Sequence, residues 1–546
     1  MEEAWRGFIM LAMTKLSEEK DPAATTDIES KARLYLHTCM KVVNQSNIPN
    51  VKQALAKGSI TWPEKNPQPD FLRALLFMSR TLAMPVLLHF IYPPEDGLLI
   101  WKQRSDYMRR AKNLRRLEHA NHIREFLSTA YEDFSGAAND TRLDEILDRM
   151  SIFLDFDNKM ANSDLTPVTF NDSTKFFEFT PSVSKERWRA ILNRYIKRPV
   201  ESYAGVTIHG VDYFKALFEV HKTHDEDVMN DIVEALAVTT LVPFTSMRMI
   251  TSFHIGHGEM SATSLMETCF SLFYPIFGYV VNHLFLYNLE TTKEHARELA
   301  ESLRATFINS TIDPSQNLVV SNTSSSKSKH TLDIVFGILD RSAPSQFPVT
   351  YKDYPSITED PLQNWVNIAH YYSGKTTENA IVKYEESDHM TFTNFVMMLH
   401  YLMFPIAGEG AHIGVLTGGI GLRFAATVFY QLVEEAGDAA AVQIYERNHQ
   451  CLGLEGGQLD IDLQGAIAAV PITQKLYAKK REDYSSKKPL GGIQSFTEEQ
   501  VPFAASCFLL CGEKKGPDLC NTPLMHSTDF SRAFSCPDNA IMNPGK

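Results

Sequence analysis

The chain has 546 residues, and its 53 basic and 66 acidic side chains give a formal net charge of −13. Its length allows two or more domains that each bury a core, and its 44% hydrophobic and 22% charged residues are typical of globular proteins. The acidic balance argues against a nucleic-acid-binding protein, because such proteins need a basic surface that neutralises phosphates.

The N-terminal segments predict helices and show no cleavable signal. Met1 to Leu16 carries Glu2 and Glu3 where a signal peptide has positive charge. Phe71 to Phe90 has Leu, Phe and Met at helical spacing, which is typical of a core helix. We interpret the basic run from Arg104 to Arg116 as a solvated helix face rather than as an anion-binding site.

Two segments in the middle of the chain bear on membrane association and on the domain boundary. Cys269 to Tyr287 is long enough to span a membrane, but Pro275, Asn282 and His283 interrupt it, which favours a buried core helix. Ser321 to Lys329 is a polar, loop-like tract near the expected change from one lobe to the next. We therefore expect no membrane span in this chain.

The cysteines and glycosylation triplets give limited information about location. The seven cysteines are scattered and lack the spacing of a zinc finger. N-x-S/T triplets are compatible with an extracellular protein, although such triplets also occur by chance; they stand at Asn44, Asn139, Asn171, Asn309 and Asn322.

The stretch from Ala411 to Tyr430 is the most informative part of the chain. A glycine-rich lead is followed by apolar residues at three- and four-residue spacing, which predicts a helix with one buried face. The lack of large side chains in the lead predicts that other elements press close to the start of this helix.

This stretch resembles the active-site helix of the neprilysin-like zinc metallopeptidases, which contains the motif H-E-x-x-H. Ile413 to Leu416 and Ile420-Gly421 match the residues before the motif, and the motif itself falls on Leu422 to Ala426. In the family, two histidines on one helix face bind zinc, and the glutamate between them is the general base. Leu422 and Ala426 offer no ligand atom, and Arg423 places a permanent cation where the family has a carboxylate.

The resemblance also places the remaining residues of the zinc site. In the family, the third zinc ligand is the glutamate of G-E-N-I-A-D, and its aspartate orients a zinc-bound histidine. The matching segment is Gln464 to Ala469, so that Gly465 replaces the glutamate and Ala469 the aspartate. Because two separate segments lack the family's ligands, the resemblance implies that this chain has lost its zinc site, and we expect no cofactor.

Further segments extend the resemblance along the chain. Ala32 to Val43 and Met266 to Cys269 match family segments whose cysteines pair, which implies a disulfide between Cys39 and Cys269. Trp365 to Tyr372 resembles the family's V-N-A-x-Y edge strand, with Asn367 or Ile368 in the place of its asparagine. By this resemblance, Asn367 and Ala369 would hold an extended peptide by strand addition.

The C-terminal tail gives the most specific match, because Phe496 to Gly512 and Thr522 to Pro544 resemble the closing segments of the family. The family's substrate loop between these segments is missing, since Glu513 to Asp518 is too short to contain it. The pairing of the remaining cysteines stays open; they are Cys451, Cys507, Cys511, Cys520 and Cys536.

By this resemblance we expect a mainly α fold with a small β component and two lobes that enclose a central cleft. Residues 1–350 would form the larger helical lobe, and residues 351–546 a thermolysin-like catalytic lobe. The resemblance also implies an extracellular or secreted protein. The predicted function is that of a metalloendopeptidase homologue without zinc binding or peptide hydrolysis, which binds a peptide or a protein partner and no nucleic acid.

The alternative is an active zinc metalloendopeptidase that cleaves small peptides through an unrecognised site. The segment from Phe253 to Glu259 contains H-x-x-H-G-E, but Gly256 and Gly258 favour a loop rather than a ligand-bearing helix. His412 lies just before the central helix and has no obvious partner in the sequence. The serine-nucleophile motif G-x-S-x-G and the phosphate loop are absent from the sequence.

Overall fold

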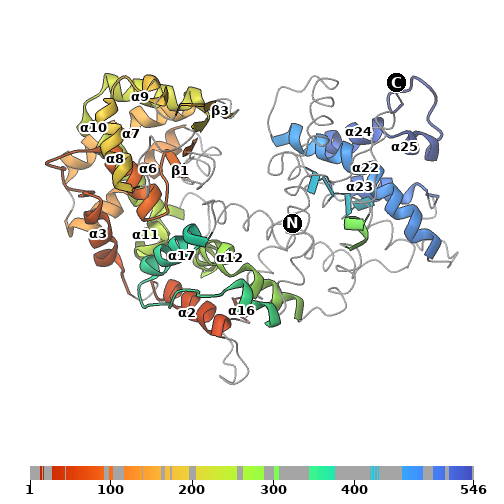
Figure 1. The fold of residues 1–546 in the computed structure, drawn as a ribbon, viewed down its shortest axis with the longest axis horizontal. Helices are drawn as coiled ribbons and strands as arrows, with labels where there is room; N and C mark the ends of the chain where they lie inside the picture. The colour runs from red at the N-terminus through yellow and green to blue at the C-terminus, as the bar shows by residue number, and fades with distance from the viewer. Residues whose placement is uncertain are drawn as a thin grey trace. The chain divides into compact units, whose positions relative to one another are not determined.

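The computed structural model of the protein shows a mainly helical chain with one small β-sheet among the residues that it describes (Figure 1). The described stretches are 27–42, 45–91, 98–102, 116–137, 139–160, 167–172, 175–195, 205–254, 262–287, 301–305, 344–375, 458–483, 496–508 without 498, and 516–543, with the single positions 13, 14, 16, 418, 419, 421, 422, 425, 426, 428, 429 and 510. The predicted fold class, mainly α with a small β component, is confirmed.

The chain divides into two compact units whose sequences interleave. The first, here the N-unit, comprises Leu16–Phe277 and Tyr351–Glu385; the second, here the C-unit, comprises Met1–Lys15, Gly278–Thr350 and Glu386–Lys546. This division differs from the contiguous lobes 1–350 and 351–546 expected from the sequence. The reason lies in Trp365, whose indole N–H donates to the carbonyl oxygen of Leu82 at 3.1 Å and ties residues beyond 350 to the N-unit.

The N-unit contains the sheet and most of the described helices. Its helices are α2 (Asp27–Lys41), α3 (Ile48–Lys57), α4 (Phe71–Leu76), α6 (Arg116–Ser135), α7 (Asp140–Lys159), α8 (Lys185–Tyr195), α9 (Val211–Thr223), α10 (Glu226–Thr240), α11 (Met247–His254) and α17 (Pro361–Lys375). A π-helical turn, η2 (Phe77–Thr81), continues α4, and the 3-10 turns η3 (Lys175–Phe179) and η5 (Val242–Phe244) precede α8 and α11.

The four strands form a mixed sheet in the order β1-β2-β4-β3, with bounds β1 (Leu88–Ile91), β2 (Leu98–Lys102), β3 (Pro167–Phe170) and β4 (Val206–His209). β2 and β4 are parallel, whereas β1 and β3 pair antiparallel on the outer sides. Phe90, Ile100 and Ile208 lie side by side in the register, and all three are buried. One face of the sheet therefore faces the core.

Aromatic side chains fill the core beside the sheet. The indole ring of Trp188 on α8 lies 6.4 Å from the ring of Phe90 and 5.5 Å from that of Phe218 on α9. Phe71 at the start of α4 lies 6.1 Å from Phe218. These rings are almost wholly buried, so this cluster supplies much of the hydrophobic stabilisation of the N-unit.

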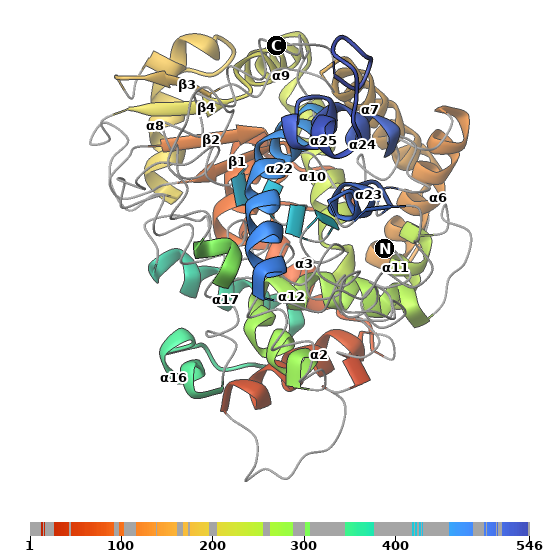
Figure 2. The ribbon, with the colours of Figure 1, turned by 90° about the vertical axis from the view of Figure 1, so that its right-hand side faces the viewer.

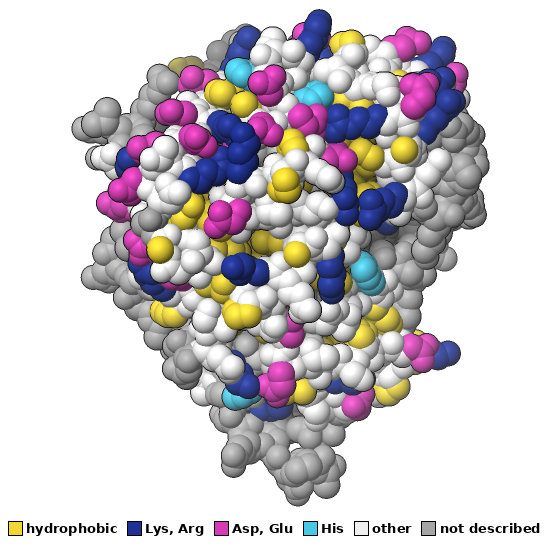
Figure 3. All heavy atoms as spheres, turned by 90° about the vertical axis from the view of Figure 1, so that its left-hand side faces the viewer, with side chains coloured by type: hydrophobic (Ala, Val, Ile, Leu, Met, Phe, Trp, Pro, Cys, Tyr) yellow, Lys and Arg dark blue, Asp and Glu magenta, His cyan; other side chains and the backbone are white. Residues whose placement is uncertain are grey.

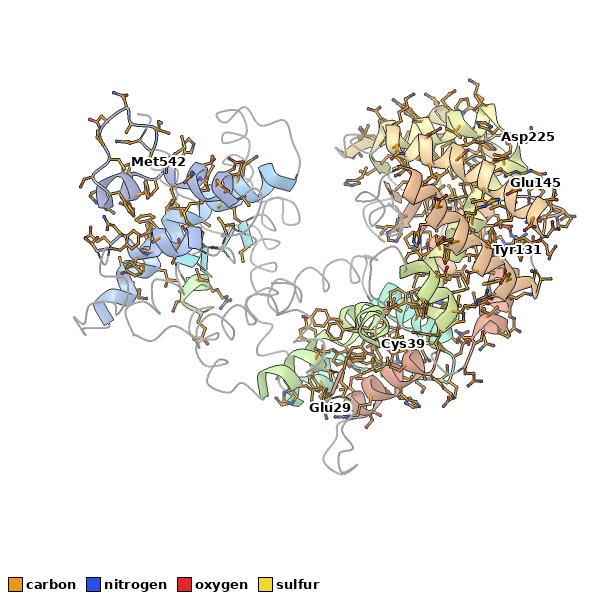
Figure 4. The ribbon with its side chains drawn as sticks, turned by 180° about the vertical axis from the view of Figure 1, so that it is seen from behind. Glu29, Cys39, Tyr131, Glu145, Asp225 and Met542 are labelled. Carbon is orange, nitrogen blue, oxygen red and sulfur yellow. A yellow bond between two sulfur atoms is a disulfide. The ribbon has the colours of Figure 1, made fainter. Side chains whose placement is uncertain are left out.

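A disulfide between Cys39 and Cys269 joins α2 to α12 (Ala262–Tyr287), as the resemblance implied. Cys39 on α2 lies beside α12 in Figure 4. The helix α12 has non-helical backbone angles at Phe277, the last residue of the first of the two segments that make up the N-unit. None of the helices in the described part of the chain is long and apolar enough to cross a membrane, and Cys269 to Tyr287 contains many buried core residues, as predicted.

The C-unit is helical in its described part. Its helices are α16 (Phe347–Thr350), α22 (Gln458–Asp483), α23 (Val501–Phe508), α24 (Gly516–Met525) and α25 (Thr528–Ala533), and a 3-10 turn, η7 (Pro344–Gln346), precedes α16. α22 lies against α24 (Figures 1 and 2). A second disulfide, Cys507–Cys520, joins α23 to α24. Cys536 is a free thiol, while Cys451 and Cys511 lie outside the described residues.

Candidate functional site

The described residues of the central stretch form a π-helical turn that continues as a helix. Gly418, Gly419 and Gly421 lie in the π-helical part, and the described positions from Leu422 to Phe429 are helical. Leu422, Ala425, Val428 and Phe429 are buried, which agrees with the predicted buried face. Arg423 and His412 lie outside the described residues.

The two segments that the resemblance matches to the family's zinc-ligand segments lie in contact in this chain. A Cβ atom placed on Gly465 of α22 would lie 2.9 Å from the backbone oxygen of Ala426 and 3.3 Å from the Cβ of Ala426. Two sequence positions that are 39 residues apart are thus in direct contact, as the resemblance requires. Ala469, one helical turn further along α22, is fully buried.

The glycine-rich lead is also in close contact with another helix. A Cβ atom placed on Gly418 would lie 2.0 Å from the backbone oxygen of Pro502 on α23. A side chain cannot occupy that space, so glycine is required at this position. The prediction that other elements press close to the start of the central helix is confirmed.

The chemistry of the contact region differs from that of a metal site. Leu422, Ala426 and Gly465 carry no nitrogen, oxygen or sulfur in their side chains. Over the part of the chain that the structure describes, no group of three or more His, Cys, Asp or Glu side chains could hold a metal ion. The donor set at these positions therefore does not fit zinc.

A shift of the family alignment by one helical turn leaves this conclusion unchanged. The family's G-G-I-G can be laid on Gly418 to Gly421, which moves H-E-x-x-H to the segment from Ala426 to Tyr430. Ala426 then takes the place of the first histidine rather than the second, on the same helix face. Either alignment brings Ala426 and Gly465 together without an imidazole or a carboxylate at these two positions.

Gln464 is the residue of this region that sequence reasoning missed. Its side chain is fully buried, and within the described part of the chain neither atom of its carboxamide has a hydrogen-bond partner. A buried amide of this kind is unusual, since most buried polar groups are hydrogen-bonded. Only the three-dimensional packing of α22 reveals it, because glutamine is common on helix surfaces.

The predicted peptide-binding strand is wrong. Asn367 and Ala369 lie in the middle of the helix α17, in the N-unit. The backbone N–H and C=O groups inside a helix bond to each other, so they are not available to pair with an added peptide strand. Asn364, one turn earlier, donates instead to the hydroxyl of Thr38 on α2 at 3.3 Å, which fixes α17 on the N-unit.

The other candidates from the sequence do not build a site among the described residues. His254 ends α11, and the rest of H-x-x-H-G-E lies outside the described residues. An open groove of about 590 Å³ between α6, α7 and α11 is lined by Arg124, Arg248 and several hydroxyls. Arg124 pairs with Asp144 at 2.6 Å and Arg248 with Asp133 at 2.8 Å, so these cations are already neutralised.

Charged groups with altered pKa values lie in the N-unit, where they hold its helices together. Burial raises the pKa of Glu234 on α10 to about 7, although hydrogen bonds from Asn230, Thr61 and Asn66 oppose this shift. Burial opposes ionisation of Glu226 too, but the hydrogen bonds from His221 and Arg187 outweigh it and lower the pKa of Glu226 to about 2.

One face of the N-unit mixes both signs of charge. Lys and Arg side chains lie among Asp and Glu side chains on the face drawn in Figure 3. Arg124 with Asp144 and Lys65 with Asp227 are examples of such surface pairs. Exposed pairs of this kind contribute little to stability, and the mixture suits a solvated surface.

Comparison with known proteins decides the family. Residues 8–311 match the sequence profile of peptidase family M13, which covers more than half of the chain. The chain belongs to this family. The match ends before Leu422, so the assignment of the zinc positions in this M13 chain depends on the resemblance of the central stretch and of Gln464 to Ala469, and on the contact between Gly465 and Ala426.

Two solved structures, one of them of a zinc metalloprotease, show the fold of the M13 chain. The crystal structure of the Mycobacterium tuberculosis zinc metalloprotease Zmp1 in complex with an inhibitor has a TM-score of 0.56 at 11% identity, covering 99% of this chain and 92% of that one. The crystal structure of PepO from Lactobacillus rhamnosis has a TM-score of 0.55 at 9% identity, covering 100% and 93%. A search of curated proteins found no match.

Proposed function

We propose that this M13 chain does not bind zinc or hydrolyse peptides, and that it acts by binding a peptide or a protein partner. The observation that carries the proposal is the contact of Gly465 with Ala426, at positions where the family has zinc ligands. Removal of all three ligands is incompatible with zinc binding, because each protein–metal bond requires a donor atom.

The binding role is supported by the retention of the whole fold. The chain covers 93% of the length of PepO despite 9% identity, which supports retention of the family's fold and of a surface that could bind a partner. The two disulfides support an extracellular or secreted protein, since disulfides persist in oxidising compartments.

The first experiment measures zinc and hydrolysis in the purified chain. We expect less than about 0.1 zinc per chain by inductively coupled plasma mass spectrometry, and no cleavage of a quenched fluorescent peptide library. Addition of a chelator should leave the melting temperature unchanged. About one tightly bound zinc per chain, together with chelator-sensitive cleavage, would contradict the loss of the site.

The second experiment tests the binding role. Fluorescence polarisation with mixtures of labelled random peptides should show saturable binding without turnover. Asn367→Ala is a suitable control, because α17 is not an edge strand and its exposed face should not contribute to strand addition. If the peptides do not bind and the protein recovers no partner on crosslinking in its native fluid, the binding role is refuted.

A further inference from the structure

We infer that a direct backbone contact between α22 and the segment 418–429 now fills the family's zinc position, so that restoring the ligand residues does not restore the site. The inference rests on the proposed function in one respect, because it takes Leu422, Ala426 and Gly465 as the former ligand positions. It goes further by assigning a structural role to Gly465.

The contact leaves no room for a side chain at position 465. A Cβ atom there would lie 2.9 Å from the backbone oxygen of Ala426, closer than such atoms approach in proteins. A backbone oxygen cannot rotate away as a side chain can, so the helices themselves must separate. The glutamate that would ligate zinc begins with this Cβ atom, and it therefore meets the same obstacle.

The segment 418–429 is held at a second point, which limits how far it can yield. Gly418 approaches the backbone oxygen of Pro502 so closely that only glycine fits. About two helical turns separate Gly418 from Ala426, so a movement of the segment away from α22 also alters its contact with α23. The disulfide Cys507–Cys520 and the packing of α24 on α22 tie these helices together.

The burial of α22 at this turn agrees with a closed contact rather than an open catalytic site. Gln464 and Ala469 are fully inaccessible to solvent, and Gly465 is buried. The Gln464 carboxamide has no hydrogen-bond partner among the described residues, so none of their polar groups reaches it. A substrate and an attacking water would need access to this face of α22.

The first test is a pair of alanine and glutamate variants read out by calorimetry. Gly465→Ala should lower the melting temperature of the C-unit by at least about 3 °C, although alanine favours helices over glycine. Gly465→Glu should lower it further, whereas the matched control Ala466→Glu, one residue along at a half-exposed position, should have a small effect. An unchanged or raised melting temperature for Gly465→Ala would overturn the inference.

A double-mutant cycle identifies the partner. Ala426→Gly removes the Cβ atom 3.3 Å away but keeps the backbone oxygen 2.9 Å away, so it should rescue Gly465→Ala only in part. Full rescue would show that the Cβ atom of Ala426, and not its backbone oxygen, limits the space at position 465, and it would overturn the inference.

The last test is reconstruction of the ligands. One variant combines Leu422→His, Ala426→His and Gly465→Glu. A second variant follows the shifted alignment and combines Ala426→His, Tyr430→His and Gly465→Glu. Both should bind less than about 0.1 zinc per chain. One zinc per folded chain in either variant would overturn the inference and leave the proposed function intact. Zinc in the wild-type chain would instead overturn the proposed function.

Discussion

The buried carboxyl of Glu234 should make the stability of the N-unit depend on pH. Its Oε1 accepts hydrogen bonds from the Nδ2 atoms of Asn230 at 2.7 Å and Asn66 at 3.2 Å, and from the backbone N–H of Thr61 at 3.3 Å. Glu234 is 1% exposed, and burial raises its pKa from 4.5 to about 7. Glu234→Gln keeps the acceptor for the three donors and the shape of the protonated carboxyl.

The sign of the effect follows from proton binding. The folded chain holds the proton more tightly than the unfolded chain, so this stabilisation is fully present below about pH 4.5 and is lost as the pH rises to about 7. The difference between a pKa of 4.5 and one of about 7 corresponds to roughly 3 kcal/mol. Glu234→Gln should therefore match the wild type near pH 5 and exceed its stability by up to about 3 kcal/mol at pH 8.

The assay is urea denaturation followed by tryptophan fluorescence between pH 5 and pH 8. Four of the five tryptophans lie in the N-unit, at positions 62, 101, 188 and 365, so this signal reports on the unit that contains Glu234. Glu226→Gln is the control: the pKa of Glu226 is lowered to about 2, so its contribution is lost only as the pH falls below about 4.5. This variant should show a constant loss across the range. Parallel curves for Glu234→Gln and the wild type would refute the reasoning.

Three further outcomes follow from buried groups. Gln464→Leu should raise the stability of the C-unit by about 1–3 kcal/mol in calorimetry, because a partnerless amide is replaced by an apolar side chain, whereas a loss would reveal a partner. Replacement of both Cys39 and Cys269 by alanine should cost up to about 5 kcal/mol in urea, since the disulfide closes a loop of 230 residues; an effect near zero would contradict the loop argument. Asp231→Ala should cost about 3 kcal/mol, because the buried Arg142 loses two hydrogen bonds of 2.7 Å and keeps the more exposed Glu145, at 3.1 Å, as its acidic contact; a neutral result would show that the pair is dispensable.

The helical periodicity and the small residues of the central stretch predicted much of the local structure of the candidate site. Spacing predicted the buried helix face, and the glycine-rich lead predicted the close approach now seen between Gly418 and Pro502. These features are local, so a single sequence carries them. The resemblance added the pairing of Gly465 with Ala426 and of Cys39 with Cys269, which lie far apart along the chain.

Two features could not be predicted, for different physical reasons. The segment from Trp365 to Tyr372 is short and rich in apolar and aromatic residues, a composition that suits a strand or a helix, and its packing on α2 decides for the helix. Whether Gln464 has a hydrogen-bond partner among the described residues depends on which side chains surround α22, and sequence spacing does not encode those neighbours.

The interleaving of the two units has a consequence for synthesis on the ribosome. The indole of Trp365 and the amide of Asn364 bond to residues near the start of the chain, at Leu82 and Thr38. The N-unit therefore completes its fold only after nearly three hundred further residues have been translated. A nascent chain released at residue 350 would lack α17 and expose the apolar surface that it covers, which makes early termination a route to aggregation.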